Sequence, residues 1–174
     1  IAIAFTFIMV WLFCGSLKLT ILPIACSIIA VIWQLGLLSS LGFGLDPMSI
    51  LVPFLVFAIG VSHGVQMINA IGKKVGEGKS TRICCQSSFR ALLIPGGIAL
   101  LSDTVGFLTL LTIDIGIIRE LAITASLGVA VIIFTNLILL PVWASYMNFE
   151  NSVHIQSGDA EKPNILDKIR DILV

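Results

Sequence analysis

The sequence predicts an all-α protein, a polytopic bundle of transmembrane helices, and three observations indicate this class. Of the 174 residues, 57% are hydrophobic and only 11% are charged, whereas soluble domains have about 45–50% apolar and about 25% charged residues. The apolar residues form long runs, and a hydrocarbon core about 30 Å thick needs about 20 such residues per helix. The ten basic and ten acidic residues cancel, which excludes intrinsic disorder and an electrostatic nucleic-acid binder.

Breaks in hydropathy define about five spans in chain order. Residues 1–14 are apolar but short for a span, so we expect them to be the end of a truncated helix. Complete spans are expected at residues 19–41, 48–71, 91–112 and 119–145. Gly and Pro mark a turn at 42–47, Asp114 and Gly116 mark another, and residues 72–90 are expected to form a polar loop.

The spans divide the chain into two expected parts, a helix bundle over 1–146 and a connector over 147–174. The connector begins with a polar stretch and ends in a segment whose apolar residues recur at helical spacing. These residues are Ile165, Leu166, Ile169, Ile172 and Leu173. We expect an amphipathic cytoplasmic helix there, lying on the membrane surface or packed against neighbouring protein.

Basic residues are unevenly distributed between the two ends of the predicted bundle. All of them except Arg119 lie at Lys18, in the loop 72–90 or in the tail. Because cytoplasmic loops of membrane proteins are enriched in Lys and Arg, we expect the loop 72–90 and the C-terminus to be cytoplasmic.

Two ionisable residues lie deep in the predicted spans, where a charged side chain costs about 2.5–3.5 kcal/mol on insertion scales. His63 and Asp103 lie about 20 Å and about 15 Å from the outer ends of their helices. Their similar depth would suit a proton relay, with Ser62 as a further member. The alternative is structural: a neutral His can bond a backbone carbonyl, and an Asp can cap a broken helix or pair with another part of the protein.

Small and polar residues nearby are candidates for helix packing. Gly60 and Gly64 form a GxxxG pattern that lets another helix approach closely, and we assign Gly106 the same role. The secondary polar candidates, which more often join helices than carry chemistry, are Gln66, Asn69 and Thr104.

Enzyme and cofactor motifs are not found in the sequence. Gly76–Thr81 has part of a P-loop pattern, but Lys73 occupies the position of its first glycine and no strand is expected before it. Ser-His-Asp, HExxH and paired-carboxylate patterns are missing. We therefore expect no enzyme activity, no cofactor and no metal.

Three stretches carry a resemblance to a known family: LDPMSILVPFLVFAIGVSHGVQMINAI, SSFRALLIPGGIALLSDTVGFLTLL and IRELAITASLGVAVIIFTNLILLPVWAS. In this order they resemble the membrane domain of the resistance-nodulation-division (RND) superfamily of exporters. The MMPL-type and hopanoid-exporter-like branch, related to sterol-sensing domains, is the most similar. The resemblance covers about residues 19–146 and implies one half of such a transmembrane domain. The chain could correspond to the first or to the second half.

The resemblance implies a function in a bacterial inner membrane. The protein would use the proton-motive force to export a hydrophobic or lipid-like molecule, with Asp103 carrying the proton and His63 and Ser62 as its relay or partner. Its other partners would be membrane lipids, the remaining half and the extracytoplasmic domains of the same transporter. A homo-oligomer is compatible with this function.

The sequence departs from the family at the acidic residue of the fourth helix. Many relatives have a Gly-Val-Asp-Tyr pattern there, whereas this sequence reads Gly60-Val61-Ser62-His63. Either the acid has moved to Asp103 in the next helix, or the other half carries the coupling. The alternative function is a sterol-sensing-domain-like, lipid-binding or regulatory membrane module without proton coupling, and a purely structural scaffold is a further alternative.

Overall fold

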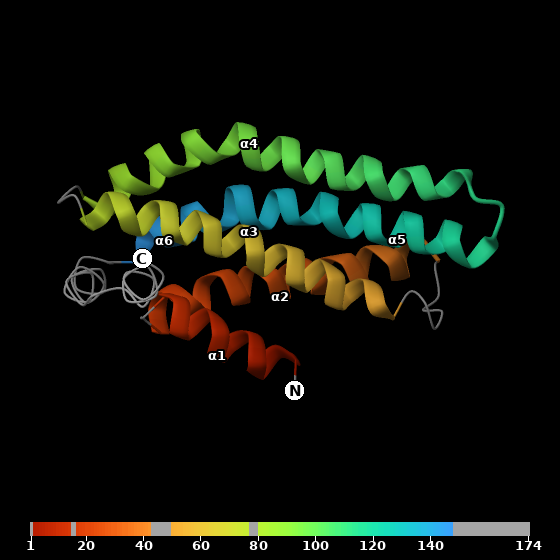
Figure 1. Ribbon diagram of the computed structural model, residues 1–174, viewed down its shortest axis with the longest axis horizontal. Helices are drawn as coiled ribbons and strands as arrows, with labels where there is room; N and C mark the ends of the chain where they lie inside the picture. The colour runs from red at the N-terminus through yellow and green to blue at the C-terminus, as the bar shows by residue number, and fades with distance from the viewer. Residues whose placement is uncertain (1, 15–16, 43–49, 77–79, 148–174) are drawn as a thin grey trace, which may run out of the picture.

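The computed structural model describes residues 2–14, 17–42, 50–76 and 80–147 (Figure 1). Within these ranges every regular element is helical. The elements are α1 (Ala2–Cys14), α2 (Leu17–Ser40), α3 (Leu51–Gly76), α4 (Thr81–Thr109), the 3-10 turn η1 (Leu110–Thr112), α5 (Gly116–Ile132), the π-helix η2 (Ile133–Leu139) and α6 (Leu140–Tyr146). The connector and its expected amphipathic helix lie outside the described residues, apart from Met147.

Within the described ranges, four helices are long and apolar enough to cross a membrane. They are α2, α3, α4 with η1, and the continuous run of α5, η2 and α6. α1 has 13 residues and is apolar but shorter than a full span, as the sequence predicts for residues 1–14. The expectation of an all-α protein with membrane-spanning helices therefore agrees with the helices that the structure describes.

The helices run roughly along one common axis, with α1 and α4 on opposite sides of the bundle (Figure 1). α2, α3 and α5 lie between them and contact one another. These three helices carry most of the largest fully buried apolar side chains, among them Leu22, Met67, Ile71 and Ile132. α4 is the least buried of the four spanning helices, and its outward face exposes apolar side chains such as Ile94, Ile98 and Leu101. Such a face is suited to contact with lipid tails.

The prediction of a polar loop at residues 72–90 is wrong for most of its length. α3 continues to Gly76 and α4 begins at Thr81. A drop in hydropathy marks where the apolar part of a helix ends, but the helix itself can continue beyond that point. Lys73 and Lys74 occupy the last turn of α3, where positive charge stabilises the helix dipole. Lys74 Nζ also donates a 2.7 Å hydrogen bond to Ser87 Oγ of α4, which ties the two helices together.

The two expected turns differ in how much of them is described. α5 begins at Gly116, after residues 113–115 turn the chain, and Arg119 Nη2 lies 2.9 Å from Asp114 Oδ1 across this turn. At the other turn, Gly42 has a φ of 78°, a value that glycine adopts without steric cost. Residues 43–47 of that turn lie outside the described residues.

The last span contains a π-helix whose cause is visible in the sequence. Pro141 has no backbone N–H, and in an α-helix its ring would clash with the carbonyl of Leu137. In the preceding turn, the Leu140 N–H donates to the carbonyl oxygen of Thr135, five residues back. The wider turn accommodates the Pro141 ring, so the helix continues as α6.

Candidate functional site

A polar face of α3 points out of the bundle at mid-span. Ser62, Gln66 and Asn69 are exposed and His63 is half-buried, whereas Gly60, Val61 and Gly64 between them are buried. This alternation follows from the helical period of 3.6 residues, because the buried positions contact α2 and α5. The polar side chains are thus left on the side that the rest of α3 does not use for packing.

Asp103 of α4 is exposed and lies across a shallow pocket from this face. The pocket has a volume of about 380 Å³ and is lined by Ala58, Ile59, Ser62, His63 and Asp103. We call it the α3–α4 pocket. The three sequence candidates for a relay, Ser62, His63 and Asp103, therefore line one pocket, although they come from two different helices.

The two ionisable groups of the pocket interact through charge and not through a direct bond. Asp103 acts electrostatically on His63, yet no hydrogen bond or ion pair within the described residues joins their side chains. An imidazole and a carboxylate can each take up and release a proton. A proton passing between them would need a water molecule or another carrier in the pocket.

The glycines of the GxxxG pattern make the close contact between α3 and α2. A methyl group at Gly64 would lie 2.6 Å from Pro23 Cβ and 3.1 Å from Pro23 Cα. One at Gly60 would lie 2.8 Å from Ser27 Oγ. Gly60 and Gly64, four residues apart on α3, thus lie against Ser27 and Pro23, four residues apart on α2, as the pattern predicts.

Within the described structure, Gly106 does not have the helix-packing role that the sequence suggested for it. It is exposed, and a methyl group there would have no described neighbour within 4 Å. The reason is that α4 lies at the edge of the bundle and turns this position outward. The sequence shows the glycine but not the direction in which it faces.

The secondary polar candidates divide into two kinds. Thr104 is occupied locally, since its Oγ1 donates a 2.8 Å hydrogen bond to the carbonyl oxygen of Leu100. Gln66 and Asn69 extend the exposed face of α3 from the α3–α4 pocket toward Lys73. They have no hydrogen-bond partner among the described residues.

A second set of polar side chains, which the sequence analysis missed, lies inside the bundle. We call it the buried polar layer: Ser27, Gln34 and Asn136. Asn136 Nδ2 donates a 2.6 Å hydrogen bond to the carbonyl oxygen of Gly60, and Gln34 Nε2 donates a 3.2 Å bond to that of Thr124. An amide in a long apolar run is the sequence signal that marks both residues.

The other motifs add no site to the described structure. No group of three or more His, Cys, Asp and Glu in the described ranges could hold a metal ion. Residues 77–79 of the partial P-loop pattern lie outside them. α3, and not a strand, precedes this segment, so the arrangement that a P-loop needs is missing there.

No family model matches this chain, and neither a curated protein nor a solved structure matches it. Its function is therefore inferred from the side chains of the sites themselves.

Proposed function

We propose that this chain belongs to the membrane domain of an RND-type exporter that uses the proton-motive force to move hydrophobic or lipid-like molecules. The observation that supports the proposal is the α3–α4 pocket, which Ser62, His63 and Asp103 all line. Ionisable residues within membrane spans are rare, and they mark proton relays and ion pathways in pumps and transporters. The pocket contains both ionisable residues that the sequence places deep in its spans.

In this proposal Asp103 carries the proton. Its carboxylate is negative when unloaded and neutral when loaded, so loading removes the charge that acts on His63. His63 is the partner that exchanges the proton or balances the charge. Ser62 contributes a hydroxyl that can donate or accept a hydrogen bond to water in the pocket.

The packing of the two helices suggests how this charge change could become a movement. α3 is held tightly on α2 at Gly60 and Gly64, whereas α4 is the least buried spanning helix. Removal of the negative charge of Asp103 from the side of the pocket opposite His63 would shift α4 relative to a fixed α3. Proton coupling requires such an element with two states that protonation biases.

Substitution of Asp103 tests the proposal in the full-length transporter. The protein is reconstituted into liposomes with an imposed pH gradient, and efflux of a lipophilic fluorescent dye is measured. Asp103→Asn removes the titrating group at nearly constant shape and is expected to abolish the gradient-dependent part of the efflux. His63→Ala is expected to reduce the same component.

Asp114→Asn is the matched control, because Asp114 is a 93% exposed carboxylate in the turn before α5. It is expected to leave gradient-dependent efflux unchanged. Retention of this efflux by Asp103→Asn would overturn the role of Asp103 in coupling.

A second candidate function is lipid binding or lipid-dependent regulation without proton coupling. It is favoured by an apolar pocket of about 430 Å³ on α2 and α5, whose lining includes Trp33, Gly36, Ser40 and Val131. A methyl group at Gly36 meets no described atom within 4 Å, so Gly36→Leu would fill this pocket without disturbing the fold. If this second function is correct, Gly36→Leu abolishes binding of a fluorescent sterol while Asp103→Asn has no effect.

A further inference from the structure

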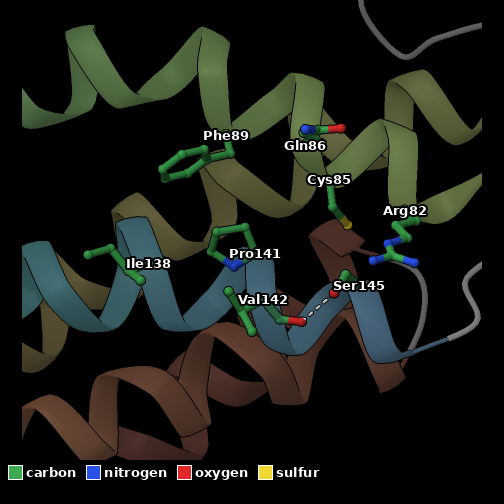
Figure 2. Close-up of a pocket in the computed structure, with 8 residues that line it drawn as sticks. All are labelled: Arg82, Cys85, Gln86, Phe89, Ile138, Pro141, Val142 and Ser145. Carbon is green, nitrogen blue, oxygen red and sulfur yellow. Dashed lines mark hydrogen bonds between the residues drawn. The ribbon is translucent and has the colours of Figure 1, made fainter.

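A different pocket opens between α4 and α6 at the basic end of the bundle (Figure 2). Its volume is about 330 Å³, and it is distinct from the α3–α4 pocket. The positive-inside rule places this end at the cytoplasmic face. We call it the α4–α6 pocket.

The lining of this pocket changes from polar to apolar along the helices. Arg82 and Ser145 lie at one end of it, and Phe89 and Ile138 lie at the other (Figure 2). Along α4, Arg82 and Phe89 are about 10 Å apart at the α-helical rise per residue. The polar end coincides with the end of the spanning helices and the apolar end lies within the span. This order matches that of a phospholipid, whose charged headgroup lies above its acyl chain.

The charge of the surroundings favours an anion at the polar end. The described part of this end has four basic side chains and no acidic one, namely Lys18, Lys73, Lys74 and Arg82. In the connecting residues 77–79, Glu77 and Lys79 cancel in formal charge. No ion pair or hydrogen bond among the described residues engages the side chains of Arg82 and Gln86. Both can therefore donate to a ligand, and Arg can bind a phosphate through two parallel hydrogen bonds.

We propose that the α4–α6 pocket binds an anionic phospholipid of the cytoplasmic leaflet. The Arg82 guanidinium binds the headgroup phosphate, and Gln86 donates a further hydrogen bond. One acyl chain lies along Phe89, Ile138 and Val142. Basic pockets between transmembrane helices on the cytoplasmic side are sites where acidic lipid headgroups bind.

A bound lipid would have a structural consequence for α4. This helix is little buried by the rest of the bundle, and the pocket joins its first turns to α6. A lipid seated there would contact both helices and hold the cytoplasmic end of α4 against α6. The site needs no proton coupling, so it can be tested apart from the exporter function.

The test is native mass spectrometry of the detergent-solubilised chain titrated with phosphatidylglycerol and with zwitterionic phosphatidylcholine. Phosphatidylglycerol is expected to bind more tightly. Arg82→Gln is expected to weaken that binding about tenfold, because charge-assisted hydrogen bonds to phosphate are the strong ones. Lys18→Gln is the matched control: it removes one positive charge at the same end, outside the pocket, and is expected to leave the affinity within about twofold.

A second variant and a soluble ligand separate the lipid from its headgroup. Val142→Trp places a bulky ring in the pocket between its polar and apolar ends, and Val142 is 50% exposed, so the fold tolerates the change. It is expected to reduce phosphatidylglycerol binding while leaving Arg82 intact. Equal binding of the two lipids, or an unchanged affinity in Arg82→Gln, would overturn the proposal. Binding of glycerol phosphate as tight as that of the lipid would also overturn it, because the site would then recognise a free anion.

Discussion

The buried polar layer and the α3–α4 pocket place polar groups on two opposite faces of α3. Gly60, whose carbonyl oxygen accepts from Asn136, and Ser62, which lines the pocket, are separated by about 200° of rotation around the helix. The amides of the buried layer each donate to a backbone carbonyl of another helix. The site side chains have no such partner in the described residues. Polar side chains inside the spans therefore have two roles. Those of the buried polar layer join helices, and those of the α3–α4 pocket remain available for chemistry.

The largest expected loss of stability comes from disturbing the close contact between α3 and α2 at Gly64. Gly64→Leu would force a side chain against the Pro23 ring and backbone, which cannot move aside as a flexible side chain can. We expect the free energy of unfolding to fall by about 3 kcal/mol, the upper end of the usual range for overpacking. Thermal unfolding in detergent micelles measures the change.

Gly106→Leu is the control for this experiment, since Gly106 is exposed and meets no described neighbour. It makes the same chemical change in another spanning helix, and its stability should equal or exceed that of the unaltered chain. Equal losses in both variants would mean that the α2–α3 contact is not what makes Gly64 necessary.

An intermediate effect is expected in the buried polar layer. Asn136→Ala removes the 2.6 Å hydrogen bond to the carbonyl oxygen of Gly60, which then keeps only its hydrogen bond within α3. The expected loss in the free energy of unfolding is about 1–2 kcal/mol, measured by the same unfolding experiment. Gln66→Ala, an exposed amide on the other face of α3, should change it by less than about 0.5 kcal/mol. A comparable loss in the two variants would remove the distinction between the faces.

The smallest effect on stability is expected at the site itself. Asp103→Asn alters an exposed side chain that makes no hydrogen bond or ion pair in the described structure, so the free energy of unfolding should change by less than about 0.5 kcal/mol. The same variant is expected to lose gradient-dependent efflux. A large loss of stability would instead indicate that Asp103 has a structural role.

Hydropathy was sufficient to predict the helical class and the helices that are long and apolar enough to cross a membrane, because each of these helices carries a long apolar stretch. It misplaced the ends at Gly76 and Thr81 because a helix can extend beyond the apolar region when its last turn carries Lys73 and Lys74. The depth of His63 and Asp103 singled out two of the five residues that line the α3–α4 pocket. The direction of Gly106 and the contacts of Gln34 and Asn136 depend on which neighbouring helix each faces, and hydropathy does not contain that information.

The π-helix Ile133–Leu139 has a consequence for how this chain can vary in length. A π-turn closes its hydrogen bond one residue later than an α-turn, so it behaves as a single-residue insertion stored inside the last span. Deletion of one residue here, with Pro141 replaced by Ala, would restore an ordinary α-helix. It would leave α6 at nearly the same rotation relative to α5, because the π-turn already accommodates the extra residue, and the buried Leu140 and Ala144 would keep facing the core. Conversion of this segment to an α-helix without the deletion would instead rotate α6 by about 100° relative to α5, so the segment should accept the loss of one residue more readily than the regular α-helices of this chain.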